Sequence, residues 1–141
     1  MIRRFTIPGE PVGKGRPRVT VRGGHAHGYT PAKTAQYERA VRQAYNLSYY
    51  GADALTTPVE LQITAYMPIP ESWPRSKKAA ALAEVIKPTV KPDGSNILKC
   101  IEDALNGLAY QDDKQIVKGT FKKLYGAWPH VDVEIWSEDA G

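Results

Sequence analysis

Segment 91–115, KPDGSNILKCIEDALNGLAYQDDKQ, carries the pattern that most constrains what this chain can fold into. When each residue advances about 100° around a helix from Asn96, six apolar side chains fall within one arc of roughly 120°. These are Ile97, Leu98, Ile101, Ala104, Leu105 and Leu108. We therefore predict a helix whose apolar face lies in the core. Asp93 or Ser95 can cap its start, and Asn106-Gly107 supplies a C-terminal stop.

The opposite face of this helix is polar. Asn96, Lys99 and Asp103 lie within roughly 60° of one another, at positions i, i+3 and i+7. Further aspartates precede the helix and follow it after a short turn, at Asp93, Asp112 and Asp113. Mg²⁺ prefers oxygen ligands, and in nucleases it polarises the scissile phosphate and activates a water. By spacing alone, two interpretations stay open: a metal site, or aspartates that cap a helix and a turn.

The rest of the chain alternates predicted strands with predicted helices. We predict strands within 3–9, 57–70, 114–126 and 129–138, and further helices within 29–46 and 76–86. Thr30 as N-cap and Pro31 at the first helical position mark the start of the first helix. The order β-α-β-α-α-β-β predicts an α/β (α+β) fold. We expect a single domain over residues 1–141, in which a mixed sheet of about four strands packs with about three helices.

Alternating apolar residues predict which faces of these elements are buried. The inward residues are Val59, Leu61, Ile63 and Ala65 in the second strand and Val131, Val133 and Ile135 in the last. In the first helix the apolar stripe is Tyr37, Val41, Ala44 and Tyr45. These faces, together with the apolar arc of the helix in 91–115, supply one core.

Length and composition are those of one ordinary globular domain. The chain has 141 residues, of which 42% are apolar and 24% charged. The single cysteine, Cys100, excludes an internal disulfide and suits a reducing cytosol, and we expect it to be buried. No apolar run approaches the roughly 20 residues of a membrane span, and the N-terminus lacks the apolar core of a secretory signal. We expect a cytoplasmic protein without a membrane partner.

Charge is distributed unevenly along the chain. Residues 1–50 hold nine basic and two acidic residues, whereas residues 51–141 hold ten and thirteen. A basic half joined to an acidic half favours a polyanion partner and a local acidic site. Nucleic acid is the obvious polyanion, because its phosphates reward clustered Lys and Arg by counterion release. A solvated charged surface explains the same counts, so charge alone does not decide between the two.

Segment 10–28, EPVGKGRPRVTVRGGHAHG, is too irregular for a helix and too long for a plain connection. We expect a long loop, either functional or disordered. The glycines of GKGRPR let the backbone approach phosphates closely, although the motif lacks the ending of a P-loop. The residues that we predict to contact the DNA backbone are Lys14, Arg16, Arg18, Arg22, Lys33, Lys91, Lys118 and Lys122. Solvated surface is the alternative interpretation, for the loop and equally for the last two lysines.

Histidines and tryptophans give weaker signals. His25 and His27 lie in the basic loop without a cluster of partner ligands, so we expect them to be exposed rather than metal-bound. Trp73, Trp128 and Trp136 are expected in the core or in a dimer contact. An exposed tryptophan would instead be able to stack on an unpaired base.

Segment 91–117, KPDGSNILKCIEDALNGLAYQDDKQIV, resembles the signature of RusA-type Holliday-junction resolvases. That signature has Lys or Arg before Pro-Asp-x-Asp-Asn, a lysine three residues on, then Asp-Ala-Leu-Asn-Gly and Asp-Asp-x-Gln. The similarity extends to IPGEPVGKGRPR, YTPAKTAQYE and KKLYG, in the same order along the chain. The composite motif is specific, whereas its fragments are not.

The resemblance implies a small α/β homodimer that cuts four-way DNA junctions symmetrically, in recombination and repair. Mg²⁺ is the implied cofactor, with Mn²⁺ as a substitute. Carried over by position, Asp93 and Asp113 would be the metal-binding, catalytic carboxylates and Lys99 the catalytic lysine. Asp112 and Asp103 match further acidic positions and are additional candidate ligands. The frequent occurrence of the family in phage-derived DNA suggests a prophage origin.

Ser95 departs from the family pattern, because it stands where the second aspartate usually lies. A neutral hydroxyl is a weak Mg²⁺ ligand, and the loss of a carboxylate reduces the charge that holds the ion. The site would then work with the remaining carboxylates, work poorly or prefer Mn²⁺, or belong to a non-catalytic relative that binds branched DNA. We expect the first, because Lys99 and the rest of the motif are present.

A restriction-type nuclease is a further alternative. Pro92-Asp93 followed by Asp113, or by Asp112-x-Lys114, weakly resembles the Pro-Asp…Asp/Glu-x-Lys pattern of those enzymes. This hypothesis makes Lys114, rather than Lys99, the essential amine.

Overall fold

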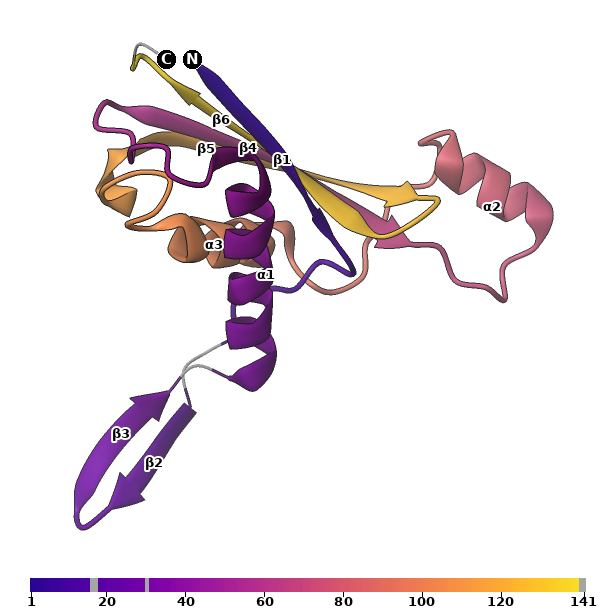
Figure 1. The fold of residues 1–141 in the computed structure, drawn as a ribbon. Coiled ribbons are helices and arrows are strands. Elements are labelled where there is room, and N and C mark those ends of the chain that lie inside the picture. The colour runs from indigo at the N-terminus through magenta and orange to yellow at the C-terminus, as the bar shows by residue number, and fades with distance from the viewer. Residues whose placement is uncertain (16–17, 30, 140–141) are drawn as a thin grey trace.

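A four-stranded mixed sheet, with helices packed against one face, forms the body of the protein (Figure 1). The computed structural model describes the backbone of residues 1–15, 18–29 and 31–139, and the side chains of these residues outside 18–22 and 25–29. The strands of the sheet are β1 (Ile2–Pro8), β4 (Val59–Pro68), β5 (Ile116–Gly126) and β6 (His130–Ser137), in the order β1-β6-β4-β5. β6 is antiparallel to both of its neighbours, whereas β4 and β5 are parallel. The α+β prediction is confirmed.

Three α-helices accompany the sheet: α1 (Ala32–Tyr49), α2 (Arg75–Leu82) and α3 (Gly94–Leu105). α1 packs against α3 and β1, and α3 packs against β5. A single turn of 3₁₀ helix, η1 (Asp113–Gln115), leads into β5. In the part of the chain that the structure describes, no helix is both long enough and apolar enough to cross a membrane.

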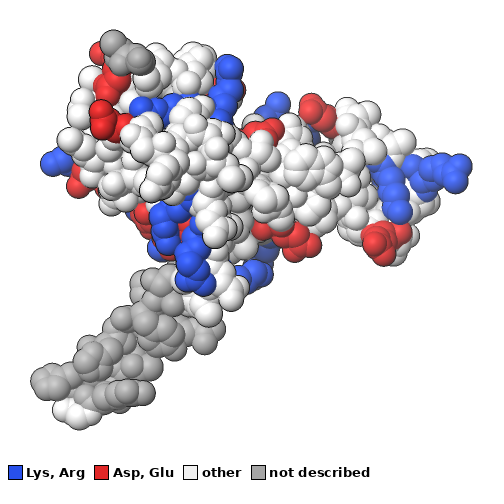
Figure 2. All heavy atoms as spheres, viewed as in Figure 1, with Lys and Arg blue, Asp and Glu red and all other residues white. Residues whose placement is uncertain are grey.

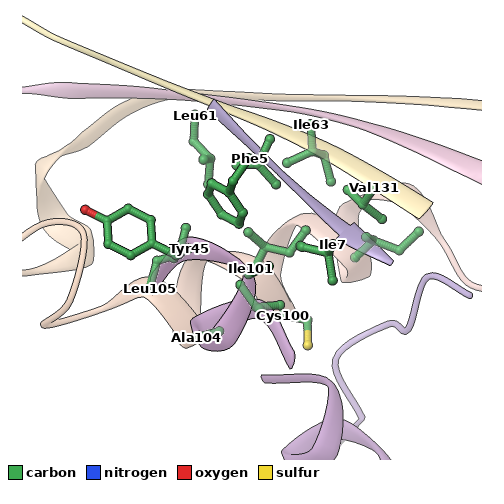
Figure 3. Close-up of a cluster of buried hydrophobic side chains, with 14 of the residues drawn as sticks. Phe5, Ile7, Tyr45, Leu61, Ile63, Cys100, Ile101, Ala104, Leu105 and Val131 are labelled. Atoms are coloured by element: carbon green, nitrogen blue, oxygen red, sulfur yellow. The ribbon is translucent and has the colours of Figure 1, made fainter. Parts of the chain in front are cut away.

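The buried faces follow the alternation of apolar residues. Every second residue of β4 from Val59 to Met67 is buried, as are the inward residues of β6. The predicted stripe of α1 and all of the predicted arc of α3 except the half-buried Leu98 and Leu108 also enter the core. Figure 3 shows how Phe5 and Ile7 of β1 meet Ile101 and Leu105 of α3 between the sheet and the helices. Cys100 is fully buried in this cluster, as expected.

The helix ends differ slightly from the sequence expectations. Asp93 is the N-cap residue of α3, and Ser95 lies within the first turn, so Ser95 does not cap the helix. Asn106 is the C-cap, and Gly107 follows with φ +80°, as the predicted stop requires. At α1, Pro31 occupies the cap position rather than the first helical position, and Thr30 lies outside the described residues.

The prediction of an irregular loop over 10–28 is wrong in its second half. There β2 (Arg18–Arg22) and β3 (His25–Tyr29) form an antiparallel hairpin, which extends away from the sheet and helices (Figure 1). Gly23 and Gly24 make its turn with φ of +56° and +80°. Two successive positive φ values are what a tight hairpin turn with the right-handed strand twist demands. Gly-Gly after the alternating Val-Thr-Val was therefore a usable hairpin signal.

Candidate active site

A cleft of about 840 Å³ opens beside the start of α3. Asp93 and Asn96 line it together with Lys14, Lys33 and Lys91. Its apolar wall includes Val12, Met67, Pro68, Val90 and Pro92. The cleft therefore combines one of the predicted catalytic carboxylates, three lysines and an apolar surface.

Asp93 is exposed and stands at the N-cap position of α3. Its side chain nevertheless accepts no capping hydrogen bond from the first turn of the helix. The interpretation of Asp93 as a side-chain cap is therefore wrong, and its carboxylate oxygens remain accessible to ligands.

The Gly-Lys-Gly segment at 13–15 crosses from α3 to α1. The backbone N–H of Lys14 donates to the carbonyl of Asn96 (2.9 Å), and the N–H of Gly15 donates to Oγ1 of Thr34 (3.1 Å). A β-carbon at Gly13 would lie only 3.0 Å from Cβ of Pro92. Glycine thus serves here for close packing between the loop and α3.

Four charged groups from three elements form a network on the polar face of α3. The ammonium of Lys14 lies 3.0 Å from Oε1 of Glu38 in α1 and 3.2 Å from Oδ2 of Asp103. The ammonium of Lys99 lies 3.2 Å from Oδ1 of the same aspartate. Asp103 therefore contacts an ammonium through each of its oxygens. Lys14, predicted to bind DNA, has two carboxylate partners within the protein.

These contacts shift the pKa of both lysines upward. For Lys14, burial lowers the pKa, but the hydrogen bonds to Glu38 and Asp103 outweigh it. For Lys99, the hydrogen bond to Asp103 raises the pKa, and the charges of Asp113 and Glu102 add to that effect. Both ammonium groups stay charged at neutral pH.

The two adjacent aspartates after α3 have different roles. Oδ1 of Asp112 accepts a hydrogen bond from the N–H of Lys114 (2.9 Å), and the N–H of Asp112 donates to Oε1 of Gln115 (2.9 Å). This reciprocal arrangement is a capping box for η1, and the hydrogen bond from Lys114 lowers the pKa of Asp112. Asp113 is half-buried, and its charge acts on both Lys99 and Glu102.

Glu102 was not among the predicted site residues. Burial raises its pKa; the charge of Lys99 lowers it in part, whereas Asp103 and Asp113 raise it further. Its position three residues after Lys99 on the polar face was the signal that would have included it.

The predicted residues are gathered only in part. Lys99 contacts Asp103, and the charge of Asp113 raises the pKa of this lysine. Asp93 instead lines the cleft with Asn96. Among the side chains that the structure describes, no three His, Cys, Asp or Glu residues form a group able to hold a metal ion. Ser95 is exposed and adds no carboxylate. Mg²⁺ often uses only one or two protein carboxylates, so the acids of this region still suit it in kind.

Lys91 and Lys33 join Lys14 in the lining of the cleft, whereas Lys118 and Lys122 lie on β5 outside that lining. Lys91, Lys118 and Lys122 are exposed, Arg16 lies outside the described residues, and only the backbone is described for Arg18, Arg22, His25 and His27. Figure 2 shows basic side chains where the hairpin leaves the body and over α2. Trp128 and Trp136 are exposed and so lie outside the core, which leaves a dimer contact or base stacking as predictions for them. Trp73 is half-buried against the core and packs on Tyr125. Trp128 stacks on His130, which stacks on Tyr66.

Burial raises the pKa of Cys100 to about 12, which is consistent with a thiol in the core.

Comparison with known proteins identifies the family. A family model described as endodeoxyribonuclease RusA matches residues 8–136. The uncharacterized protein YqaN of Bacillus subtilis (strain 168) is 40% identical over 135 residues, which cover 94% of each chain. The family match runs from Pro8, at the end of β1, to Trp136 in β6 and includes Asp93, Lys99 and Asp113. The chain therefore belongs to the RusA family of endodeoxyribonucleases, the nucleases that resolve Holliday junctions.

Proposed function

We propose that this protein is a Mg²⁺-dependent, structure-selective endodeoxyribonuclease that resolves Holliday junctions by paired symmetric cleavage. The observation that carries this proposal is the environment of Lys99. Its ammonium lies on the polar face of α3, 3.2 Å from Oδ1 of Asp103. The charges of Asp113 and Glu102 also raise its pKa. A cation beside several carboxylates suits a reaction in which both a metal ion and a phosphate must be held.

Asp93 and Asp113 are the residues that we infer to hold the ion. Asp93 is exposed and does not cap α3, and Asp113 leaves the capping of η1 to Asp112. Carboxylate oxygens of this kind, supplemented by water and substrate oxygens, satisfy Mg²⁺. When bound, the ion would polarise the scissile phosphate and lower the pKa of a water. Mn²⁺, which takes the same oxygen ligands, is expected to substitute.

Lys99 is the residue that we infer to stabilise the phosphate during cleavage. Its raised pKa keeps the ammonium fully charged at neutral pH, and one of its three N–H donors faces Asp103, which leaves two for a phosphate. Negative charge grows on the phosphate oxygens and on the leaving oxygen as water attacks. A donor aimed at that charge lowers the barrier more than it stabilises the bound substrate.

The cleft beside Asp93 suits one strand of branched DNA. Lys33 and Lys91 are exposed residues of its lining and are able to contact phosphates, while the exposed Val90 offers an apolar surface to a sugar or base. A homodimer would present two such sites to the two opposed strands of a junction with two-fold symmetry. The match to the endodeoxyribonuclease family supports a DNA substrate.

The test is cleavage of a synthetic four-way junction and a matched linear duplex by the purified protein. We expect paired nicks at symmetric positions in the junction with Mg²⁺ or Mn²⁺, and none with EDTA. The linear duplex should remain intact under the same conditions. Equal cutting of both substrates, or junction cutting in EDTA, would contradict the proposal.

A non-catalytic protein that binds branched DNA is the second candidate. It is favoured by Ser95, an exposed hydroxyl where the family has an aspartate, and by the lack of a three-carboxylate group among the described residues. Tight junction binding without cleavage in either metal would establish it. Cleavage that appeared only in Ser95→Asp would then identify the missing carboxylate as the cause.

A further inference from the structure

We propose that Asp103 is a positioning residue, which fixes the ammonium of Lys99 by tying it to Lys14 and α1, and is not a metal ligand. The inference rests on the proposed function, because it assigns a part in the same site. It goes beyond that function by giving a role to three residues of the network: Asp103, Lys14 and Glu38.

Both oxygens of Asp103 already face cations. Lys99 lies 3.2 Å from Oδ1 and Lys14 lies 3.2 Å from Oδ2. A divalent ion at this carboxylate would approach two positive ammonium groups and would have to displace at least one of them. Asp103 is therefore a poor ligand, although its position in the sequence motif makes it a candidate.

An ion pair between Lys99 and Asp103 alone would not hold the lysine firmly. Pairs of this i,i+4 kind at a surface are weak, and the side chain of Lys99 is 53% exposed on a flexible stem. Asp103 differs from an ordinary surface acid because Lys14 anchors its second oxygen. The side chain of Lys14 is only 24% exposed, and that of Glu38, its other partner, only 15%.

The backbone of the loop completes the anchor. The N–H of Lys14 donates to the carbonyl of Asn96 in α3, and the N–H of Gly15 donates to Thr34 in α1. These bonds fix the backbone of Lys14, and the contact with Glu38 holds its ammonium beside α1. Loop, α1 and α3 together define where the Oδ1 atom of Asp103 lies, and that atom defines where the ammonium of Lys99 lies. A catalytic group that is misplaced by about 1 Å can lose a hundredfold in rate.

Single-turnover junction cleavage at varied Mg²⁺ concentration separates positioning from metal binding. We expect Asp103→Asn to lower the maximal rate by about tenfold to a hundredfold, with the half-saturating Mg²⁺ concentration unchanged. Asp103→Glu should recover part of the rate, and Lys14→Gln should lower it in the same direction. Glu71→Gln, which neutralises an exposed acid before α2, is the matched control and should behave as wild type.

Two results would overturn the proposal. One is a rise of about tenfold or more in the half-saturating Mg²⁺ concentration of Asp103→Asn, with the rate restored at high Mg²⁺, as expected when a carboxylate that binds the ion directly is lost. The other is an unchanged rate. Thermal unfolding followed by circular dichroism identifies a variant that fails to fold, in which case Asp103→Glu and Lys14→Gln decide the matter.

Nitrogen relaxation of the Lys99 ammonium, measured by NMR, gives a readout that does not depend on cleavage. We expect an ordered ammonium in the wild type and in Glu71→Gln, and a disordered one in Asp103→Asn. If the wild type cuts no junction, the proposed function fails, and the relaxation measurement still decides whether Asp103 orders Lys99. Equal order in the wild type and Asp103→Asn overturns the positioning role.

Discussion

The ring of Phe121, in β5, fills the space that a β-carbon of Gly94 would occupy at the first turn of α3. Such a β-carbon would overlap the ring atoms Cδ2 and Cε2. Gly94 directly follows Asp93, so this contact seats the start of α3, and with it the candidate metal-binding carboxylate, against the edge strand of the sheet.

Gly94→Ala should destabilise the protein by about 1–3 kcal/mol, because the added methyl group forces the aromatic ring or the helix to move. Urea denaturation measures the effect. In a Phe121→Ala background the same change at Gly94 should cost much less, since the obstructing ring is gone. If the losses in unfolding free energy of the two single variants simply add in the double variant, an alanine at position 94 does not clash with the Phe121 ring.

Lys99→Ala should reduce the single-turnover rate of junction cleavage by about a hundredfold or more, because it removes the charge that faces the phosphate. Lys114→Ala should leave the rate within about threefold, a change of less than 1 kcal/mol in the barrier. Its side chain is exposed on η1, and the backbone N–H that Asp112 binds is retained. Loss of cleavage in the Lys114 variant alone would favour the restriction-type mechanism instead.

Asp93→Asn and Asp113→Asn should abolish cleavage while leaving junction binding in Ca²⁺ intact, since an amide removes the charge that holds the ion. Asp112→Ala should behave differently. It should cost about 1 kcal/mol of stability through loss of the η1 cap and retain most of the activity. Gel-shift, cleavage and denaturation assays on the three variants together show which aspartates bind the metal ion and which one caps η1. Full activity in either asparagine variant would remove that residue from the proposed site.

Ser95→Asp should lower the Mg²⁺ concentration needed for cleavage, because it adds a carboxylate next to the candidate site in the first turn of α3. The new charge should also stabilise the helix by about 0.3–1 kcal/mol through the helix dipole. Ser95→Ala is the control and should show neither effect. A Mg²⁺ requirement that is identical in both variants would mean that this position does not face the ion.

Alkaline pH should weaken the protein through Lys14 and Lys99. Their folded-state pKa values are raised above the ordinary 10.5, so the folded state binds these protons more tightly than the unfolded chain. The resulting stabilisation is complete below pH 10.5 and is lost as the pH rises through the raised values. The unfolding free energy should therefore fall above that pH, and more steeply in the wild type than in Lys14→Gln. Equal slopes would contradict this.

The periodic spacing of apolar residues was enough to predict which faces of the helices and strands are buried. The arc from Ile97 to Leu105, apart from the half-buried Leu98, and the alternation from Val59 to Met67 are buried as expected. The hairpin around Gly23 was missed because the glycines, prolines and basic residues of segment 10–28 resemble an irregular loop. Among site residues, Glu102 was missed because the acidic positions of the family motif are aspartates.

The sequence by itself determined the family, the order of the elements and the core faces, because each depends on residues that are close in the chain or on a long ordered motif. Only the tertiary structure decided the partners of the charged groups. Whether Asp103 meets Lys14 or a metal ion depends on which loop lies across α3. That contact joins segments far apart in sequence, and helical spacing places no constraint on it.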